Sequence, residues 1–184
     1  RASEAALAWL LARSRSLPLA AFVGLPAVVD GLLYNCAALI CRGKLLGVVP
    51  KTYLPNYREF YELRQFTPAG SALKAITLAG QSTRFGPLLF RSKEQPRLVL
   101  FAEICEDLWV PAPPSSFAAL AGATVVANLS ASNVLVGKDQ YRKELAGNQS
   151  ARCIAAYLYS AAGAGESTTD LAWDGHALAF ENGS

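Results

Sequence analysis

RLVLFAEICEDLWVP, residues 97–111, is the segment from which the fold class is most readily inferred. Its first nine residues are almost all apolar, as expected of a central strand that is buried on both faces. Glu106 and Asp107 then end the strand, with Cys105 at the boundary. Strand ends that lead into a turn are where α/β proteins expose reactive side chains. The segment therefore predicts an α/β protein with a candidate nucleophile at Cys105.

Strands and helices are expected to alternate on both sides of this segment. Helical periodicity predicts helices at residues 4–14, 116–121 and 138–155. Apolar runs bounded by turn residues predict strands at residues 19–29, 33–41, 44–49, 88–91, 97–105, 123–129, 156–161 and 176–180. Residues 52–83 lack a clean period and are expected to form a loop with short helix, and residues 163–174 a second loop. The alternation predicts layered α/β architecture without an internal domain boundary.

Composition and charge exclude several classes of protein. The chain has 184 residues, of which 52% are hydrophobic and 17% are charged, so it is globular and large enough for one domain or part of one. The net charge of +3 is small, and no basic cluster is interleaved with aromatic residues, so no nucleic-acid partner is expected. The longest apolar stretch, residues 17–29, is broken by proline and glycine, so no membrane span is expected. The first residue, Arg1, and the hairpin-like end at residues 181–184 predict an excerpt of a longer chain.

The cysteine pattern indicates neither a metal site nor a disulfide framework. None of the four cysteines forms a CxxC pair, and the chain has one histidine, so no metal site is expected. Cys36, Cys41 and Cys153 lie in apolar runs, where free cysteine behaves as a small buried hydrophobe. A reducing, cytoplasmic setting follows.

Lys51 occupies a position that is parallel to that of Cys105, directly after the apolar strand LLGVVP. An ammonium group there would favour thiolate over thiol and stabilise a tetrahedral intermediate. The alternatives are a buried structural cysteine and a solvated lysine, and position alone does not decide between these readings.

Two other titratable residues are weaker candidates. His176 stands alone in a strand-like segment, where a packing or solvent-facing role is expected. A cysteine enzyme here would therefore use glutamate and lysine rather than the usual histidine partner. Glu103 shares the strand face of Cys105 and is expected to have a structural hydrogen-bonding role.

Four segments carry a resemblance to a known family: PKTYLPNYREFYE (50–62), AEICEDLWVP (102–111), NLSASNVLVGKDQYRKEL (128–145) and GAGESTTDLAWDGHALAFENG (163–183). They resemble the glutaminase domain of bacterial glutamine-dependent NAD synthetases over essentially the whole chain. The resemblance implies a nitrilase-like αββα sandwich, incomplete at both ends, with residues 1–184 forming a partial domain. The block at residues 163–174 separates this branch from ordinary nitrilases and amidases.

The resemblance also implies a Glu-Lys-Cys catalytic triad. Cys105 matches the nucleophile that attacks the glutamine side-chain amide, forms a γ-glutamyl thioester and releases ammonia. Lys51 matches the triad lysine. The general-base glutamate of the family lies in a Pro-Glu loop before the first helix, and Glu4, which lies inside that helix, does not match it. The 184-residue piece alone is therefore expected to have negligible glutaminase activity.

Substrate-binding residues follow from the same resemblance. Tyr57, Ser132 and Lys138 fall on glutamine-binding positions, where Lys138 would hold the α-carboxylate. Glu106 is suited to the α-ammonium group. The alternatives are ordinary loop packing for Tyr57 and Ser132 and a solvated helix start for Lys138. A supporting second glutamate is assigned to Glu59, with Glu62 as its rival.

The implied parent enzyme passes ammonia to an NAD synthetase domain that this chain does not contain. ATP and magnesium belong to that domain, and no cofactor is expected here. L-Glutamine, the synthetase domain and further copies of the protein, as a homo-oligomer, are the expected partners. A stand-alone nitrilase-superfamily amidase and a non-catalytic interaction module of the same fold are the alternatives.

Overall fold

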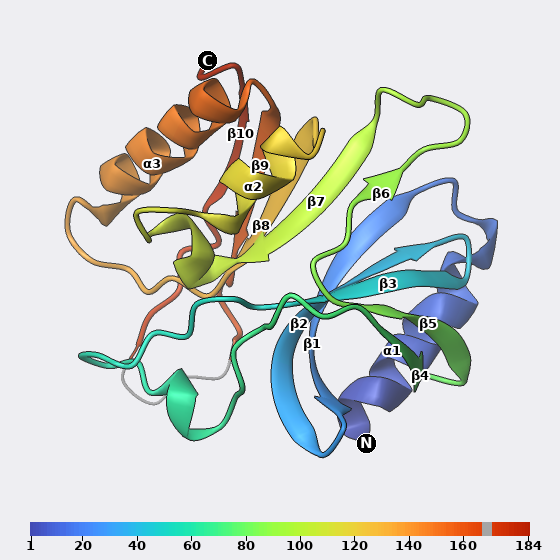
Figure 1. The fold of residues 1–184 in the computed structure, drawn as a ribbon. Helices are drawn as coiled ribbons and strands as arrows, with labels where there is room; N and C mark the ends of the chain where they lie inside the picture. Colours follow the sequence, from blue (N-terminus) through green and yellow to red (C-terminus); the bar gives the residue numbers. More distant parts are fainter. Residues whose placement is uncertain (167–170) are drawn as a thin grey trace. The chain divides into compact units, whose positions relative to one another are not determined.

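A computed structural model describes residues 1–166 and 171–184 of the chain. The chain divides into two compact units, Arg1–Leu88 and Leu89–Ser184, which run from blue to green and from green to red in Figure 1. Within the described residues, each unit carries one five-stranded sheet.

Unit 1 begins with a helix and continues with a mainly antiparallel sheet. Its elements are α1 (Ala2–Arg13), the 3₁₀ turn η1 (Ser14–Ser16), β1 (Ala20–Val29), β2 (Leu32–Cys41), β3 (Lys44–Pro50), the 3₁₀ turn η2 (Glu62–Arg64), β4 (Lys74–Leu78) and β5 (Gln81–Phe85). The strand order is β1-β2-β3-β5-β4, and only the β3–β5 pair is parallel. Hairpin turns with positive φ at Asp30-Gly31 and Arg42-Gly43 connect the first three strands.

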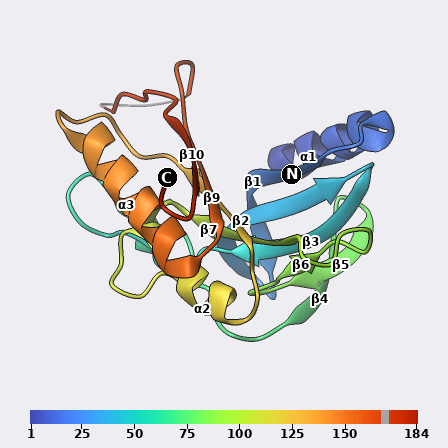
Figure 2. The same ribbon diagram turned by 90° about the horizontal axis from the view of Figure 1, so that it is seen from above.

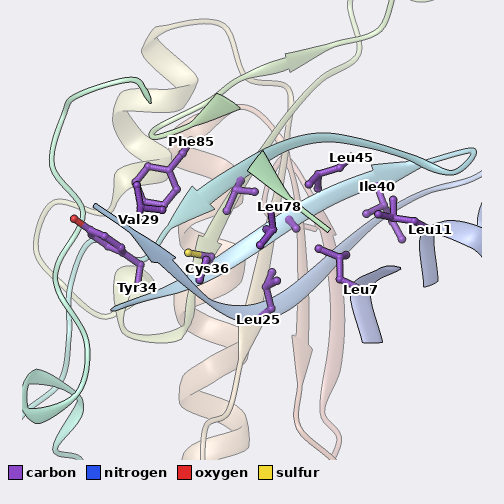
Figure 3. Close-up of a cluster of buried hydrophobic side chains, with 13 residues drawn as sticks. Leu7, Leu11, Leu25, Val29, Tyr34, Cys36, Ile40, Leu45, Leu78 and Phe85 are labelled. Atoms are coloured by element: carbon purple, nitrogen blue, oxygen red, sulfur yellow. The ribbon is translucent and has the colours of Figure 1, made fainter. Parts of the chain in front are cut away.

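The core of unit 1 lies between α1 and one face of this sheet. Leu7 and Leu11 extend from the helix toward the strands, as Figure 3 shows. Alternate residues of β1 and β2 contribute the facing side chains, with Leu25 and Cys36 near the centre of the cluster. Burying these apolar side chains supplies the main stabilisation of α1, whose period places Leu7 and Leu11 on one face.

Unit 2 is built around three parallel strands. Its elements are β6 (Phe90–Arg91), β7 (Val99–Ile104), the 3₁₀ turn η3 (Cys105–Leu108), α2 (Pro114–Leu120), β8 (Val125–Ser130), α3 (Lys138–Cys153), β9 (Ala156–Ala161) and β10 (Ala177–Glu181). The strand order is β10-β9-β8-β7-β6. The strands β7, β8 and β9 pair in parallel, and β6 and β10 are antiparallel edge strands.

Both helices of unit 2 cover one face of its sheet, as seen from two directions in Figures 1 and 2. Ser115 at the start of α2 donates its backbone N–H to the Glu103 carboxylate of β7. Gln149 of α3 donates to the Ser115 hydroxyl, so the two helices also contact each other. The covered face is therefore joined to its helices by polar as well as apolar contacts.

The α/β class and the expected helices and strands are confirmed, with shifts of a few residues at their ends. One expectation is wrong. Residues 52–83 were expected to be loop with short helix, yet this stretch contains η2, all of β4 and the start of β5. The two strands are short, and their side chains alternate between half-buried and exposed positions. Such a hairpin has little apolar periodicity of its own and depends on its pairing with β3.

The loop expected at residues 163–174 forms no helix or strand in its described parts, and residues 167–170 of it lie outside the described residues. No helix among the residues described is both long and apolar enough to cross a bilayer.

The hairpin turn at Gly43 supplies a prediction about the stability of unit 1. Gly31 and Gly43 have nearly equal φ values of +77° and +78°, but only at Gly43 would a Cβ atom meet the chain, 2.5 Å from Arg15 Cγ and 3.1 Å from the Leu11 carbonyl oxygen. We expect G31A to lower the free energy of unfolding by about 1 kcal/mol, from backbone strain alone. We expect G43A to lower it by about 2–4 kcal/mol, since overpacking adds to the strain.

Urea unfolding of both variants measures these changes. Equal losses in the two variants would show that the contact of α1 and η1 with this turn contributes nothing.

Candidate functional site

Lys51 lies directly after β3 and is almost completely buried, with 1% of its surface exposed. Its ammonium nitrogen lies 2.8 Å from each carboxylate oxygen of Glu62. The backbone of Lys51 is fixed on both sides, because its N–H donates to the Asn35 carbonyl and its carbonyl accepts from Ala69 N–H. A buried ammonium requires such a partner. The local structure of unit 1 therefore holds Lys51 as one half of a bidentate ion pair.

Glu62, the rival assignment, occupies the place beside Lys51 that a supporting glutamate would take. Glu62 begins η2, and its backbone N–H donates to the Pro55 carbonyl. Tyr57 and Glu59 lie in the preceding loop. The Tyr57 ring packs edge-on against the Phe60 ring there, with 6.1 Å between the ring centres. The assignments of Tyr57 to substrate and of Glu59 to a supporting role stay predictions.

Cys105 stands where β7 passes into η3, and its backbone φ is +49°. This left-handed conformation costs a non-glycine residue about 1 kcal/mol and persists only where neighbouring contacts fix it. One such contact is made by Asp107, whose buried carboxylate accepts the Ile104 N–H at 2.9 Å. The Cys105 thiol is free and half-buried. The turn therefore holds a strained cysteine at the carboxyl edge of the parallel strands.

The loop after β8 lies close to η3 through Lys138. Lys138 begins α3, and its ammonium nitrogen lies 2.6 Å from Asn133 Oδ1 and 5.5 Å from the centre of the Trp109 ring. Ser132 is buried beside Asn133. These contacts bring the loop of Ser132, the start of α3 and the turn after Cys105 together within unit 2. The cation–π contact and the amide partner also offset the cost of a positive charge at a helix start.

Arg142 of α3 is fully buried and holds the loop after β8 in place through hydrogen bonds to its backbone. Its Nη2 donates to the carbonyls of Ser132 and Asn133, at 3.1 and 2.9 Å. Its Nη1 donates to Asp174 Oδ2 at 2.5 Å and lies 3.3 Å from His176 Nδ1. One guanidinium therefore connects α3, the loop after β8 and the segment before β10. His176 thus contributes to packing around Arg142, in line with the role expected for it.

Arg142 was missed by the sequence reasoning, although a signal for it exists. Arg142, Ala146, Gln149 and Cys153 follow one another at helical spacing and lie on the face of α3 that contacts the rest of unit 2. An arginine on an otherwise small and uncharged helix face predicts a buried partner. Asp174, 28% exposed, is that partner. Burial raises the pKa of Asp174, but the hydrogen bonds from Arg142 and the His176 N–H and the charge of Arg142 together outweigh it, so the pKa is lowered.

Glu103 has the structural hydrogen-bonding role expected for it. It is 1% exposed and accepts hydrogen bonds from the Tyr157 hydroxyl and from Ser115 N–H. The Tyr157 hydroxyl also accepts from Asn128 Nδ2 at 3.1 Å, and Asn128 Oδ1 accepts from the Ser130 hydroxyl at 2.7 Å. Burial raises the pKa of Glu103, and these hydrogen bonds offset the increase only in part. The chain of contacts stiffens the strands behind Cys105.

Two of the other cysteines are held in the thiol form by burial. Burial raises the pKa of Cys36 to about 12 and also raises the pKa of Cys153. Neither thiol is therefore suited to nucleophilic attack at neutral pH. Among residues 1–166 and 171–184, no group of three or more metal-binding side chains is close enough to hold a metal ion.

The sequence-predicted site residues fall into two sets. Cys105, Glu106, Ser132 and Lys138 belong to unit 2, where the contacts through Trp109 and Asn133 bring their segments together. Lys51, Tyr57 and Glu59 belong to unit 1. The convergence of Lys51 with Cys105 stays a prediction. Glu4, which was not expected to be the base, accepts the Ala79 N–H at 3.0 Å and so connects α1 to the β4–β5 turn.

The buried carboxyl of Glu103 supplies a prediction about pH. Its pKa in the folded protein is raised from the ordinary value of 4.5. At a pH between the ordinary pKa and the raised pKa, the folded state binds more protons than the unfolded state. The contribution of Glu103 to the free energy of unfolding therefore falls as pH rises. We expect the free energy of unfolding of the wild type, relative to E103Q, to fall as pH increases from 4 to 8 in urea titrations. A difference that is constant over this range would contradict the assignment.

Comparisons with known proteins place the chain among enzymes of one family. No protein-family model matches it. It is 52% identical over 184 residues to the glutamine-dependent NAD(+) synthetase of Mycobacterium tuberculosis, a match that covers 100% of this chain and 27% of that protein. The chain thus spans about a quarter of the length of such relatives.

Solved structures agree. A glutamine-dependent NAD(+) synthetase from Cytophaga hutchinsonii matches 99% of this chain and 29% of its own, with a TM-score of 0.84 and 28% identity. The enzyme from Acinetobacter baumannii, in complex with ADP, matches 99% of this chain and 31% of its own, with a TM-score of 0.78 and 24% identity. An amidase of the nitrilase superfamily from Nesterenkonia matches 98% of this chain and 60% of its own, with a TM-score of 0.72 and 18% identity, which shows the shared fold. The chain is therefore related over its whole length to a part of the glutamine-dependent NAD(+) synthetases, and it shares its fold with an amidase of the nitrilase superfamily.

Proposed function

We propose that the protein to which this chain belongs hydrolyses the side-chain amide of L-glutamine, with Cys105 of this chain as the nucleophile, and supplies the ammonia to its own ATP-dependent NAD synthetase domain. The observation that carries the proposal is the strained Cys105 at the carboxyl edge of β7, in a chain that matches the family over its whole length. ATP and magnesium belong to the synthetase domain, and no residue here is assigned to them. The proposal includes a cytoplasmic homo-oligomer.

In the proposed reaction, the Cys105 thiolate attacks the amide carbon of glutamine. The tetrahedral intermediate collapses to a γ-glutamyl thioester and expels the amide nitrogen, which leaves as ammonia after taking up a proton. Water then hydrolyses the thioester to glutamate and restores the thiol. No residue of this chain matches the glutamate that serves as general base in the family, so of the catalytic triad the proposal assigns only the nucleophile and the lysine.

Four residues would bind the substrate around that thiol. Lys138 carries a positive charge for the α-carboxylate, and Glu106, adjacent to the nucleophile, carries a negative charge for the α-ammonium group. Ser132 and Tyr57 supply hydroxyl groups for further hydrogen bonds. The contacts of Lys138 with Asn133 and Trp109 support its place beside the turn after Cys105.

Replacing Cys105 by alanine tests the proposal in the full-length protein. We expect C105A to lower glutamine-supported NAD formation at least about a thousandfold, because the nucleophile is gone. Free ammonia should still support synthesis, since it bypasses the amide hydrolysis. A glutamine-like electrophile should label Cys105 in the wild type, as located by mass spectrometry. Labelling at Cys36, Cys41 or Cys153 instead would overturn the assignment.

The same assay separates the proposal from a stand-alone amidase on this fold. Glutamine hydrolysis without any coupled NAD formation would favour the amidase.

Lys51 is proposed to lie beside Cys105 and to favour its thiolate form. We expect K51M to slow the alkylation of Cys105 by iodoacetamide at pH 7 roughly fivefold to tenfold. Lys44, exposed at the other end of β3, provides the matched control K44M, which should alkylate at the wild-type rate. Equal rates for K51M and the wild type would remove Lys51 from the site.

A further inference from the structure

The Tyr159 hydroxyl is one of three buried side-chain polar atoms without a hydrogen-bond partner in the described part of the chain, beside Arg142 Nε and Trp173 Nε1. Tyr159 is 2% exposed, and its hydroxyl makes no hydrogen bond within the described part of the chain. A buried hydroxyl that lacks a partner costs about 1–3 kcal/mol. Such a group in a native protein calls for an explanation, and a bound ligand or an ordered water is the usual one.

The sheet register places Tyr159 in the same row as Glu103, which precedes the nucleophile by two residues. Glu103 of β7, Asn128 of β8 and Tyr159 of β9 are aligned across the three parallel strands. Cys105 follows Glu103 by two residues and begins η3 directly after the end of β7, so it lies at the carboxyl edge of these strands. A tyrosine ring is long enough to extend from its own row toward the next.

The surroundings of the Tyr159 hydroxyl agree with this placement. Burial raises the pKa of Tyr159, the Ser130 and Ser132 hydroxyls lower it, and the charge of Cys105 raises it again. The two serine hydroxyls are thus close enough to act on Tyr159, although neither makes a hydrogen bond of ordinary geometry with it. Ser132 is also the serine assigned above to the substrate. The unpartnered hydroxyl therefore lies among the groups that surround the thiol.

Tyr157, on the same strand, is a tyrosine whose hydroxyl is hydrogen-bonded within the protein. It lies two residues before Tyr159 on the same face of β9 and is fully buried. Its hydroxyl donates to Glu103 and accepts from Asn128. The two tyrosines match in strand, face and burial, and differ in whether the protein satisfies the hydroxyl.

We propose that the Tyr159 hydroxyl donates a hydrogen bond to an oxygen atom of the amide substrate bound at Cys105. The inference rests on the proposed function and adds a substrate-contacting residue to it. With the site empty, a water molecule takes the place of the substrate oxygen. Because the partner comes from outside the chain, the hydroxyl serves binding or catalysis and adds nothing to the stability of the folded state.

The test compares Y159F with Y157F in the full-length protein, since each change removes one hydroxyl and keeps the ring. Glutamine hydrolysis and urea unfolding are measured for both. We expect Y159F to lower kcat/KM for glutamine about tenfold, the loss of one hydrogen bond, and to leave the urea midpoint unchanged. We expect Y157F to lower the urea midpoint and to keep KM within about twofold of the wild type.

Three outcomes would overturn the inference: Y159F with wild-type kcat/KM, Y159F with a lowered urea midpoint, or equal kinetic losses in the two variants. Failure of the proposed function has a different signature, because the wild type itself would then release no ammonia from glutamine.

Discussion

Parallel pairing of β7, β8 and β9 is the constraint on which the site in unit 2 depends. Parallel strands point in one direction, so the segments that follow them emerge at one edge of the sheet. The turn of Cys105, the loop of Ser132 and the segment after Ala161 therefore meet without being close in sequence. Register is equally important, because a slip of one residue in β7 would move Glu103 to the other face of the sheet and would displace the turn that begins at Cys105.

Buried polar contacts define that register more narrowly than apolar packing alone. Glu103, Asn128 and Tyr157 satisfy one another across three strands, and any slip would leave a buried carboxyl or amide without a partner. The cost of such a group exceeds that of misplacing one aliphatic side chain of similar size. The network therefore contributes to a unique strand alignment, and through it to the position of the thiol.

Arg142 fixes a loop of unit 2 by buried polar contacts, as Glu103, Asn128 and Tyr157 fix the strands. The loop after β8 carries Ser132, a proposed substrate-binding residue, and two carbonyls of this loop accept from one guanidinium, which fixes its backbone. Asp174 neutralises the charge from the opposite side. The planar fork of arginine suits this geometry, since it directs several N–H groups in fixed directions. Lysine could not make the same set of contacts.

Local patterns predicted much of the fold, and long-range contacts account for what they missed. Apolar runs such as residues 97–105 predict strands, because a strand that is buried on both faces consists almost entirely of apolar residues. The β4–β5 hairpin has no such apolar pattern, because several of its residues face solvent and its pairing with β3 holds it in place. The same limit applies to side chains: position suggested Cys105 and Lys51, but nothing in the sequence distinguishes the free Tyr159 hydroxyl from the bonded Tyr157 hydroxyl.

The Lys51–Glu62 ion pair fixes a buried positive charge in unit 1. An ammonium group has three N–H donors, and the two oxygens of Glu62 accept from it at 2.8 Å each. The carboxylate stabilises the ammonium charge in a buried position and restricts the rotation of the lysine side chain. Two accepted bonds leave one donor direction for a further acceptor. A lysine held in this way would meet a developing oxyanion or thiolate without reorganising, which is the condition under which electrostatic stabilisation is most effective.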